Sequence, residues 1–136
     1  MDVTEALSDL MELSSQVEAA VVLDGAGTLV GSTLAAGSRA EELAQAAREL
    51  LAAAERVRAR AGSPPVSQLE AATRSGSVFV IRGESRTIAA TTAPSPTTGL
   101  VLYDLKTCLR ALGDEEVEQE PQAAEVSGAE GGDAAA

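Results

Sequence analysis

The chain has 136 residues, the length of a single domain, and it contains no histidine and only one cysteine. This composition excludes Ser-His-Asp and Cys-His catalysis, most zinc sites and an internal disulfide bond. The formal net charge is −11, and the lack of clustered basic and aromatic side chains excludes a nucleic-acid partner, which needs cations for its phosphates and rings for its bases.

The sequence also carries no signal for export or membrane insertion. A lone cysteine does not favour an oxidising compartment, and Met1–Glu5 lacks the basic segment and apolar run of a signal peptide. No apolar stretch approaches the roughly 18 residues of a membrane span. We therefore expect a soluble, cytoplasmic protein.

The first elements are predicted to be a helix and a β-hairpin. A narrow apolar stripe predicts a helix over about Val3–Ser14. Ala19–Leu23 is a β-branched run of strand length, and Leu29–Leu34 has the pattern of its return strand. The turn between them, Asp24–Thr28, is rich in glycine and typical of a hairpin.

The spacing of Gly25, Gly27 and Gly31 is similar to that of a dinucleotide-binding loop. Such a loop requires a helix that begins within the glycines, so that the helix N-terminus meets the pyrophosphate. Here Leu29–Thr33 is β-prone, and no P-loop motif occurs. The glycines therefore favour a hairpin turn, and we expect no cofactor.

Residues Ser38 to about Ala61 predict one long helix, with a capping-box pattern in Ser38 and Glu41 at its start and Gly62 at its end. Its apolar residues cover roughly half of the circumference, more than a surface helix needs. Four residues at the centre of this arc are predicted to face a sheet: Leu43, Leu50, Ala54 and Ala61. The alanine-rich flanks then remain for a second protein, unless alanine is present only because it is the best helix former.

Three strands and a helix complete the predicted domain. The strands are expected over Val66–Thr73, Val78–Ile81 and Thr87–Thr92, and Leu100–Leu112 predicts the last helix. Cys108 lies on the apolar side of that helix, where a buried structural thiol is expected. The order of elements predicts an α+β fold, with a five-stranded, mainly antiparallel sheet sandwiched between helices.

The charge distribution divides the chain at Leu112. Residues 1–112 carry thirteen acids and ten bases, whereas residues 113–136 carry eight acids and no base. The second segment also lacks aromatic residues, which is typical of disorder. We therefore expect one nearly neutral domain, 1–112, followed by an acidic, disordered tail, 113–136.

Over residues 3–112, four features occur in a specific order: a hydrophobic strand ending in Asp24-Gly25-x-Gly27, a Ser38-capped alanine-rich helix, a Gly76-x-Val78-Phe79-Val80-Ile81 strand, and Ala93-Pro94 followed by Thr98-Gly99-Leu100-Val101. In this order and spacing they resemble the Roadblock/dynein light chain family, especially its small bacterial MglB-like members.

The resemblance implies a homodimer or heterodimer, of which we expect the homodimer, in which the long helices pack together and the strand Val66–Thr73 pairs with its symmetry mate. By position, it places five residues in the dimer interface: Ala44, Ala47, Leu51, Gln68 and Glu70. It further implies that the dimer binds a Ras-like small GTPase, with three charged residues toward that partner: Arg48, Glu55 and Arg58. Which side of the long helix meets which partner stays open. The family brings no catalytic motif, so we expect neither an enzyme nor a metal site.

Two kinds of function remain open from the sequence. The first is a dimeric regulator or scaffold that binds a bacterial Ras-like GTPase and modulates its GTP hydrolysis or localisation. The second is a small-ligand sensor or a passive protein-interaction module, since sheets covered by helices also occur in sensor domains. On the first hypothesis, Leu51→Glu weakens dimerisation or partner binding without unfolding the domain.

Overall fold

The computed structural model describes residues 1–35, 38–59, 62 and 64–113. Its elements follow the predicted order, and their boundaries differ from the predicted ones by no more than two residues. In chain order they are α1 (Val3–Leu13), β1 (Val17–Leu23), β2 (Leu29–Ser32), α2 (Ser38–Ala59), β3 (Gln68–Thr73), β4 (Gly76–Arg82), β5 (Thr87–Thr92) and α3 (Thr98–Ala111).

The five strands form one sheet in the order β2-β1-β5-β4-β3, and every neighbouring pair is antiparallel. Strands β1, β5 and β4 therefore lie in the middle of the sheet. Val21 and Val22 of β1 project to opposite faces, and both are 0% exposed. This burial on two sides explains why the runs Ala19–Leu23 in β1 and Val78–Ile81 in β4 are apolar instead of alternating with polar residues.

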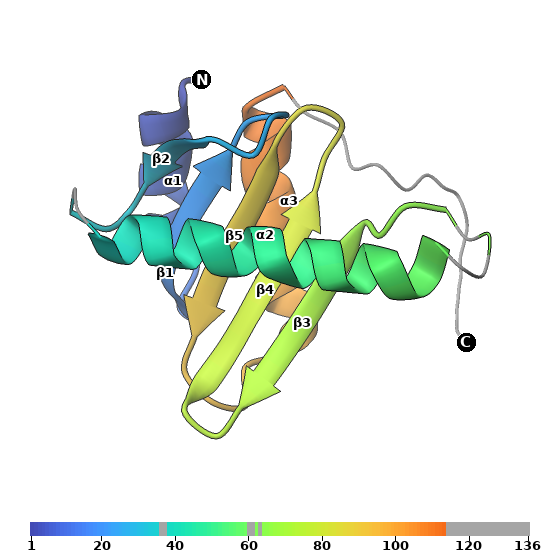
Figure 1. The fold of residues 1–136 in the computed structure, drawn as a ribbon. Coiled ribbons are helices and arrows are strands. Elements are labelled where there is room, and N and C mark those ends of the chain that lie inside the picture. Colours follow the sequence, from blue (N-terminus) through green and yellow to red (C-terminus); the bar gives the residue numbers. More distant parts are fainter. Residues whose placement is uncertain (36–37, 60–61, 63, 114–136) are drawn as a thin grey trace.

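Helices cover both faces of the sheet (Figure 1). Helices α1 and α3 lie on one face, and α2 crosses the strands on the other. The core on the α1/α3 side includes Phe79 and Leu105, and the core on the α2 side includes Val80 and Ala89. The predicted sandwich of a mainly antiparallel sheet between helices is confirmed.

The two edges of the sheet differ in how well they are closed. Strand β2 is short, its pairing with β1 shifts register between Val22 and Leu23, and its Gly31 lies against Val3 of α1. Strand β3 pairs with β4 in unbroken register, and no other strand of the described chain lies on its outer side. Short, irregular edges resist further pairing, whereas regular ones invite it. The edge of β3 is therefore the open one.

The helix ends follow local capping rules. Helix α1 begins with a capping box that the sequence analysis did not anticipate, in which the backbone N–H of Glu5 donates to Oδ1 of Asp2 at 2.8 Å. Gly62, with φ of 66°, follows α2 as predicted, and its N–H donates to the carbonyl of Ala59 at 3.1 Å. The predicted cap by the Ser38 side chain, the predicted sheet contact of Ala61 and the tail after Gly113 lie outside the described part. No described helix is long and apolar enough to cross a membrane.

Candidate functional site

The side of α2 that faces the sheet includes Leu43 and Leu50, as predicted, but its most deeply buried residues are alanines. Ala44 and Ala47 are 0% exposed and pack on the sheet, together with Ala40 and Leu43. Small side chains allow the helix to lie close to Val80 and its neighbours, which explains the alanines at these positions. Ala44 and Ala47, which the sequence analysis placed in a dimer interface, therefore have no surface left for a second chain.

Leu51 is half-buried and packs against the same core. It borders a hollow of about 420 Å³ between α2, the β1–β2 turn and the β4–β5 turn. A charge at this position would disturb the core of the monomer as well as any interface. We therefore expect Leu51→Glu to destabilise the monomer, which makes Leu51 a poor site for testing association.

A second apolar row runs along α2 beside the buried one. It contains Ala46, Leu50, Ala53 and Val57, at the i, i+4, i+7, i+11 spacing of one helix face. Ala46 and Leu50 are half-buried, Ala53 is exposed, and Val57 is 69% exposed. We call these four residues the α2 apolar stripe. These four residues belong to the apolar arc predicted for this helix. They were not predicted as site residues, although their spacing on one helix face could have identified them.

The C-terminal turns of α2 reach past the edge strand β3, which explains why Val57 lacks cover (Figure 1). Arg56 and Arg58 are also exposed on these turns. Helix α2 as a whole carries four glutamates and four arginines, so its net charge is zero. A neutral helix with an uncovered apolar row can approach a copy of itself without net repulsion.

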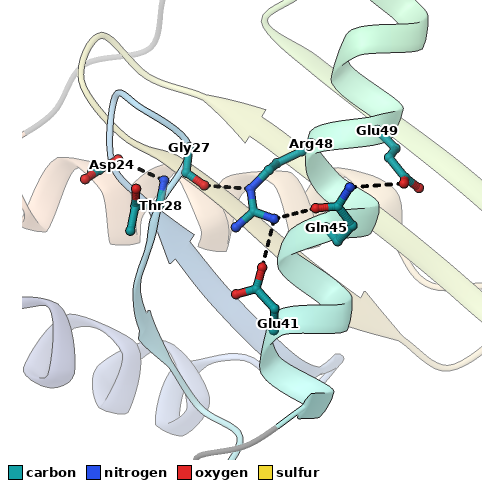
Figure 2. A network of polar contacts seen from close by, with 7 residues as sticks. All are labelled: Asp24, Gly27, Thr28, Glu41, Gln45, Arg48 and Glu49. Carbon is teal, nitrogen blue, oxygen red and sulfur yellow. Dashed lines mark hydrogen bonds and ion pairs between the residues drawn. The ribbon is translucent and has the colours of Figure 1, made fainter.

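Arg48 lies on the opposite flank of α2, in a network that fastens the helix to the β1–β2 turn (Figure 2). Its Nε donates to the carbonyl of Gly27 at 2.6 Å, and its Nη1 donates to Glu41 at 2.9 Å and to Gln45 at 2.7 Å. The planar guanidinium group suits three acceptors held in a fixed arrangement. Arg48, predicted to bind a partner, thus has a structural role within the chain.

Glu55 is similarly engaged with its own chain. One of its carboxylate oxygens accepts from Nη1 of Arg82 at 2.7 Å and from the backbone N–H of Val66 at 3.0 Å. These contacts join the end of α2 to β4 and to the segment that leads into β3. Of the three charges predicted to face a partner, only Arg58 is exposed.

Gln68 and Glu70 lie on the open edge strand, as predicted, but their side chains project from the sheet face that carries α3. Glu70 is paired in register with Phe79 of the α1/α3 core, and its Oε1 lies 3.5 Å from Oγ1 of Thr98 at the start of α3. The outer edge itself therefore consists of the backbone of β3.

The glycine-rich segment after β1 forms a hairpin turn. The N–H of Gly27 donates to the carbonyl of Asp24 at 2.9 Å, and Oδ1 of Asp24 accepts from the N–H groups of Ala26 and Thr28. This is strand-to-strand geometry, not the helix N-terminus that a pyrophosphate requires. Among the described residues, no three His, Cys, Asp or Glu side chains gather as a metal site would need.

Comparison with known proteins agrees with this architecture. The family model for the Roadblock/LC7 domain matches residues 3–93. The crystal structure of a Roadblock/LC7 domain from Streptomyces avermitilis is similar with a TM-score of 0.74 and 18% sequence identity, covering 83% of this chain and 96% of that one.

Two MglB structures are also similar. The gliding protein MglB from Thermus thermophilus has a TM-score of 0.66 and 16% identity, covering 79% of this chain and 83% of that chain. An MglB described with a tetrameric arrangement has a TM-score of 0.67 and 16% identity, covering 79% and 82%. No curated protein matches the sequence significantly. Because the family model covers more than half of the chain, the chain belongs to the Roadblock/LC7 domain family.

Proposed function

We propose that this chain forms a homodimer through α2 and the β3 edge, and that the dimer binds a Ras-like small GTPase and modulates its hydrolysis of GTP or its localisation. The observation that carries the proposal is the α2 apolar stripe, in which Ala53 and Val57 are exposed and Ala46 and Leu50 half-buried, beside an open strand edge. Membership in the Roadblock/LC7 family and the similarity to MglB support it. In this proposal the partner supplies the nucleotide site.

The dimer follows from one symmetry operation. A two-fold axis perpendicular to the sheet pairs β3 with its copy in an antiparallel, isologous contact and keeps both α2 helices on the same face. The two helices then run antiparallel, and their stripes face each other, because the Arg48 flank is already occupied by the β1–β2 turn. The dimer interface so proposed contains the stripe, the backbone of β3 and the neighbouring side chains of Gln68 and Glu70.

The register of the paired strands is constrained by charge. An axis through Glu70 would place two carboxylates directly opposite each other, which is unfavourable. An axis through Leu69 places Glu70 opposite Gln68, whose amide can donate to the carboxylate, and an axis through Ala71 places Glu70 opposite Ala72. We therefore propose a register centred on Leu69 or Ala71.

The outer surface of the paired helices is the proposed GTPase-binding surface. Arg58 is exposed in the last turn of α2. A charged side chain at the rim of such a surface contributes to orientation and association rate more than to affinity. Arg48 and Glu55 contribute indirectly, because their contacts fix the position of α2 against the sheet.

Val57→Glu tests the dimer and its role together. Because Val57 is 69% exposed, the charge should leave the stability of the monomer unchanged while disrupting the helix–helix contact. We expect sedimentation velocity to show a dimer for the wild type and a monomer for the variant. The variant should also lose its effect on GTP hydrolysis by a Ras-like GTPase from the same genome. Val30→Glu, on the exposed side of the far edge strand, is the matched control.

The outcomes separate the alternatives. A wild-type chain that remains monomeric at high concentration contradicts the dimer. A stable dimer that binds the GTPase equally in its GDP and GTP states, with no change in hydrolysis, indicates a passive scaffold instead of a regulator.

The hollow beside Leu51 favours a second candidate function, sensing of a small ligand. It is lined by Arg48, Arg82 and Arg86 together with Asp24 and Glu84. Arg48 and Arg82 already form ion pairs, and Arg86 donates to the carbonyl of Leu112 at 3.3 Å, so less of their binding capacity remains for a ligand. Thermal-shift screening with anionic metabolites tests this function, and a ligand-dependent rise in the melting temperature would support it.

A further inference from the structure

Helices α1 and α3 lie on the sheet face opposite α2 (Figure 1). A groove lies between these two helices. Its volume is about 310 Å³. Ala6, Leu10 and Cys108 form its floor and are each at most 4% exposed, and Leu13 and Tyr103 stand at its sides. We call this the α1–α3 groove. None of the residues assigned to the proposed dimer or GTPase-binding surface lines it.

The sides of the groove expose apolar area in an ordered pattern. Leu13 is 73% exposed and Tyr103 is 63% exposed, although both are large apolar or aromatic side chains. Leu100, which is 55% exposed, continues the row of Tyr103 at i, i+3 spacing on α3. Exposed aromatic and aliphatic side chains beside a concave apolar floor are typical of a docking surface.

The charge at the groove is of one sign. Asp9 of α1 and Asp104 of α3 line it, and no lysine or arginine does. Helix α1 contains Glu5, Asp9 and Glu12 and no basic residue. In the floor of the groove, burial and then the charge of Asp9 raise the pKa of Cys108 to about 11.

These features together select the occupant. We infer that the α1–α3 groove binds an amphipathic helix of a partner protein, whose apolar stripe lies on Leu10, Leu13 and Tyr103 and whose lysine or arginine side chains pair with Asp9 and Asp104. The groove is walled by helix side chains and offers no strand edge, so it suits a helix more than an extended peptide. It lies on the other face from α2, so this binding goes beyond the proposed function.

Charge also argues against the nearest alternative occupants. A second copy docked by the same face would bring Asp9 and Asp104 against their own copies, and like charges disfavour such an interface. The segment after Leu112 carries eight acids and no base, so it is repelled by the same carboxylates.

The chain carries its own reporter for this groove. Tyr103 is its only tyrosine, and there is no tryptophan. The probe is a short amphipathic peptide of leucine and lysine without aromatic residues, titrated into the full chain while tyrosine emission is recorded. We expect a saturable change in emission, and no change with the matched peptide in which glutamate replaces lysine.

Two sets of variants locate the binding. Asp9→Asn with Asp104→Asn should weaken the affinity for the lysine peptide by about tenfold, and Leu13→Ser should weaken it to a similar extent. Glu42→Gln with Glu49→Gln removes the same number of charges from exposed positions on α2, outside the groove, and should leave the affinity unchanged. Circular dichroism confirms that each variant is folded.

Several results would overturn the inference. Emission that stays constant while a labelled lysine peptide binds would show attraction to the acidic tail only. Equal binding of the glutamate peptide, or unchanged affinity in the Asp9/Asp104 variant, would remove the charge recognition. Loss of self-association in Tyr103→Ala would make a second copy the occupant.

Discussion

At the scale of single residues, Gly31 shows how a contact distant in sequence fixes an amino acid. Its backbone conformation is ordinary, but a Cβ at this position would overlap with Cγ1 of Val3 at the start of α1. The absence of a side chain lets α1 pack directly on the edge strand β2. In the sequence, the spacing of Gly31 from the preceding glycines is similar to that of a nucleotide-binding loop. Such a spacing cannot show that Gly31 packs against a side chain of another element.

We predict that Gly31→Ala lowers the free energy of unfolding by about 1–3 kcal/mol, because α1 must shift to accommodate the methyl group. Adding Val3→Ala should recover part of the loss by removing the overlapping atoms. Urea denaturation measures both. Gly99→Ala in α3 is the matched control, since nothing lies within 4 Å of its added Cβ, and it should be neutral or stabilising. Equal losses for the two glycines would contradict this account.

At the scale of elements, runs of strand length between turn residues were enough to predict the five strands, and apolar periodicity predicted the three helices. The rotation of α2 about its axis was not predictable. Leu43, Leu50, Ala54 and Ala61 were expected at its centre, and Leu43 is buried. Ala44 and Ala47 nevertheless lie deepest, because a helix that lies close to a sheet needs small side chains there. A hydrophobicity pattern gives leucine more weight than alanine. The predicted sheet-facing side of the helix is therefore shifted toward its leucines.

The charged residues of α2 were misassigned for a related reason. The sequence alone does not distinguish Arg48 and Glu55 from charged residues that only face solvent. Arg48 donates to the carbonyl of Gly27, 21 positions away, and Glu55 accepts from the N–H of Val66, 11 positions away. Periodicity along one helix contains no information about such partners. The open edge of β3, in contrast, follows from strand order, which the family resemblance supplied.

Glu55 offers a test of this reassignment. Its side chain is 31% exposed, and that of Arg82 is 27% exposed, so removing the carboxylate leaves two donors poorly solvated. We predict that Glu55→Ala lowers the free energy of unfolding by about 1–3 kcal/mol, and that Glu55→Gln, which keeps an acceptor for the N–H of Val66, lowers it less. Denaturation in urea measures the difference.

Glu49→Ala provides the comparison, because Glu49 is exposed and accepts only from its helix neighbour Gln45 at 3.1 Å among the contacts described. Its substitution should change stability by no more than about 0.5 kcal/mol. If Glu55→Ala were as stable as Glu49→Ala, the carboxylate of Glu55 would be available to a partner after all.

At the scale of the whole molecule, cysteine cross-linking can determine the proposed strand register. Directly opposite residues of antiparallel strands lie within disulfide range. Leu69→Cys should form a covalent dimer if the axis passes through Leu69, and Ala71→Cys should do so if it passes through Ala71, as seen on a non-reducing gel.

The native thiol does not interfere with this measurement. Cys108 is 4% exposed, and its pKa is raised to about 11, so it remains a protonated, unreactive thiol at neutral pH. The unmodified chain should therefore give no covalent dimer. Glu70→Cys should also give none, and an efficient link at that position would contradict the proposed register.

The unequal edges of the sheet have a consequence for assembly size. A sheet with two receptive edges can add copies without end, as in fibres, whereas here Gly31, the register shift and α1 close the β2 edge. Joining two copies through β3 pairs the open sheet edge of each described domain. Assembly by pairing of sheet edges therefore stops at a dimer. Any larger complex must form through other surfaces.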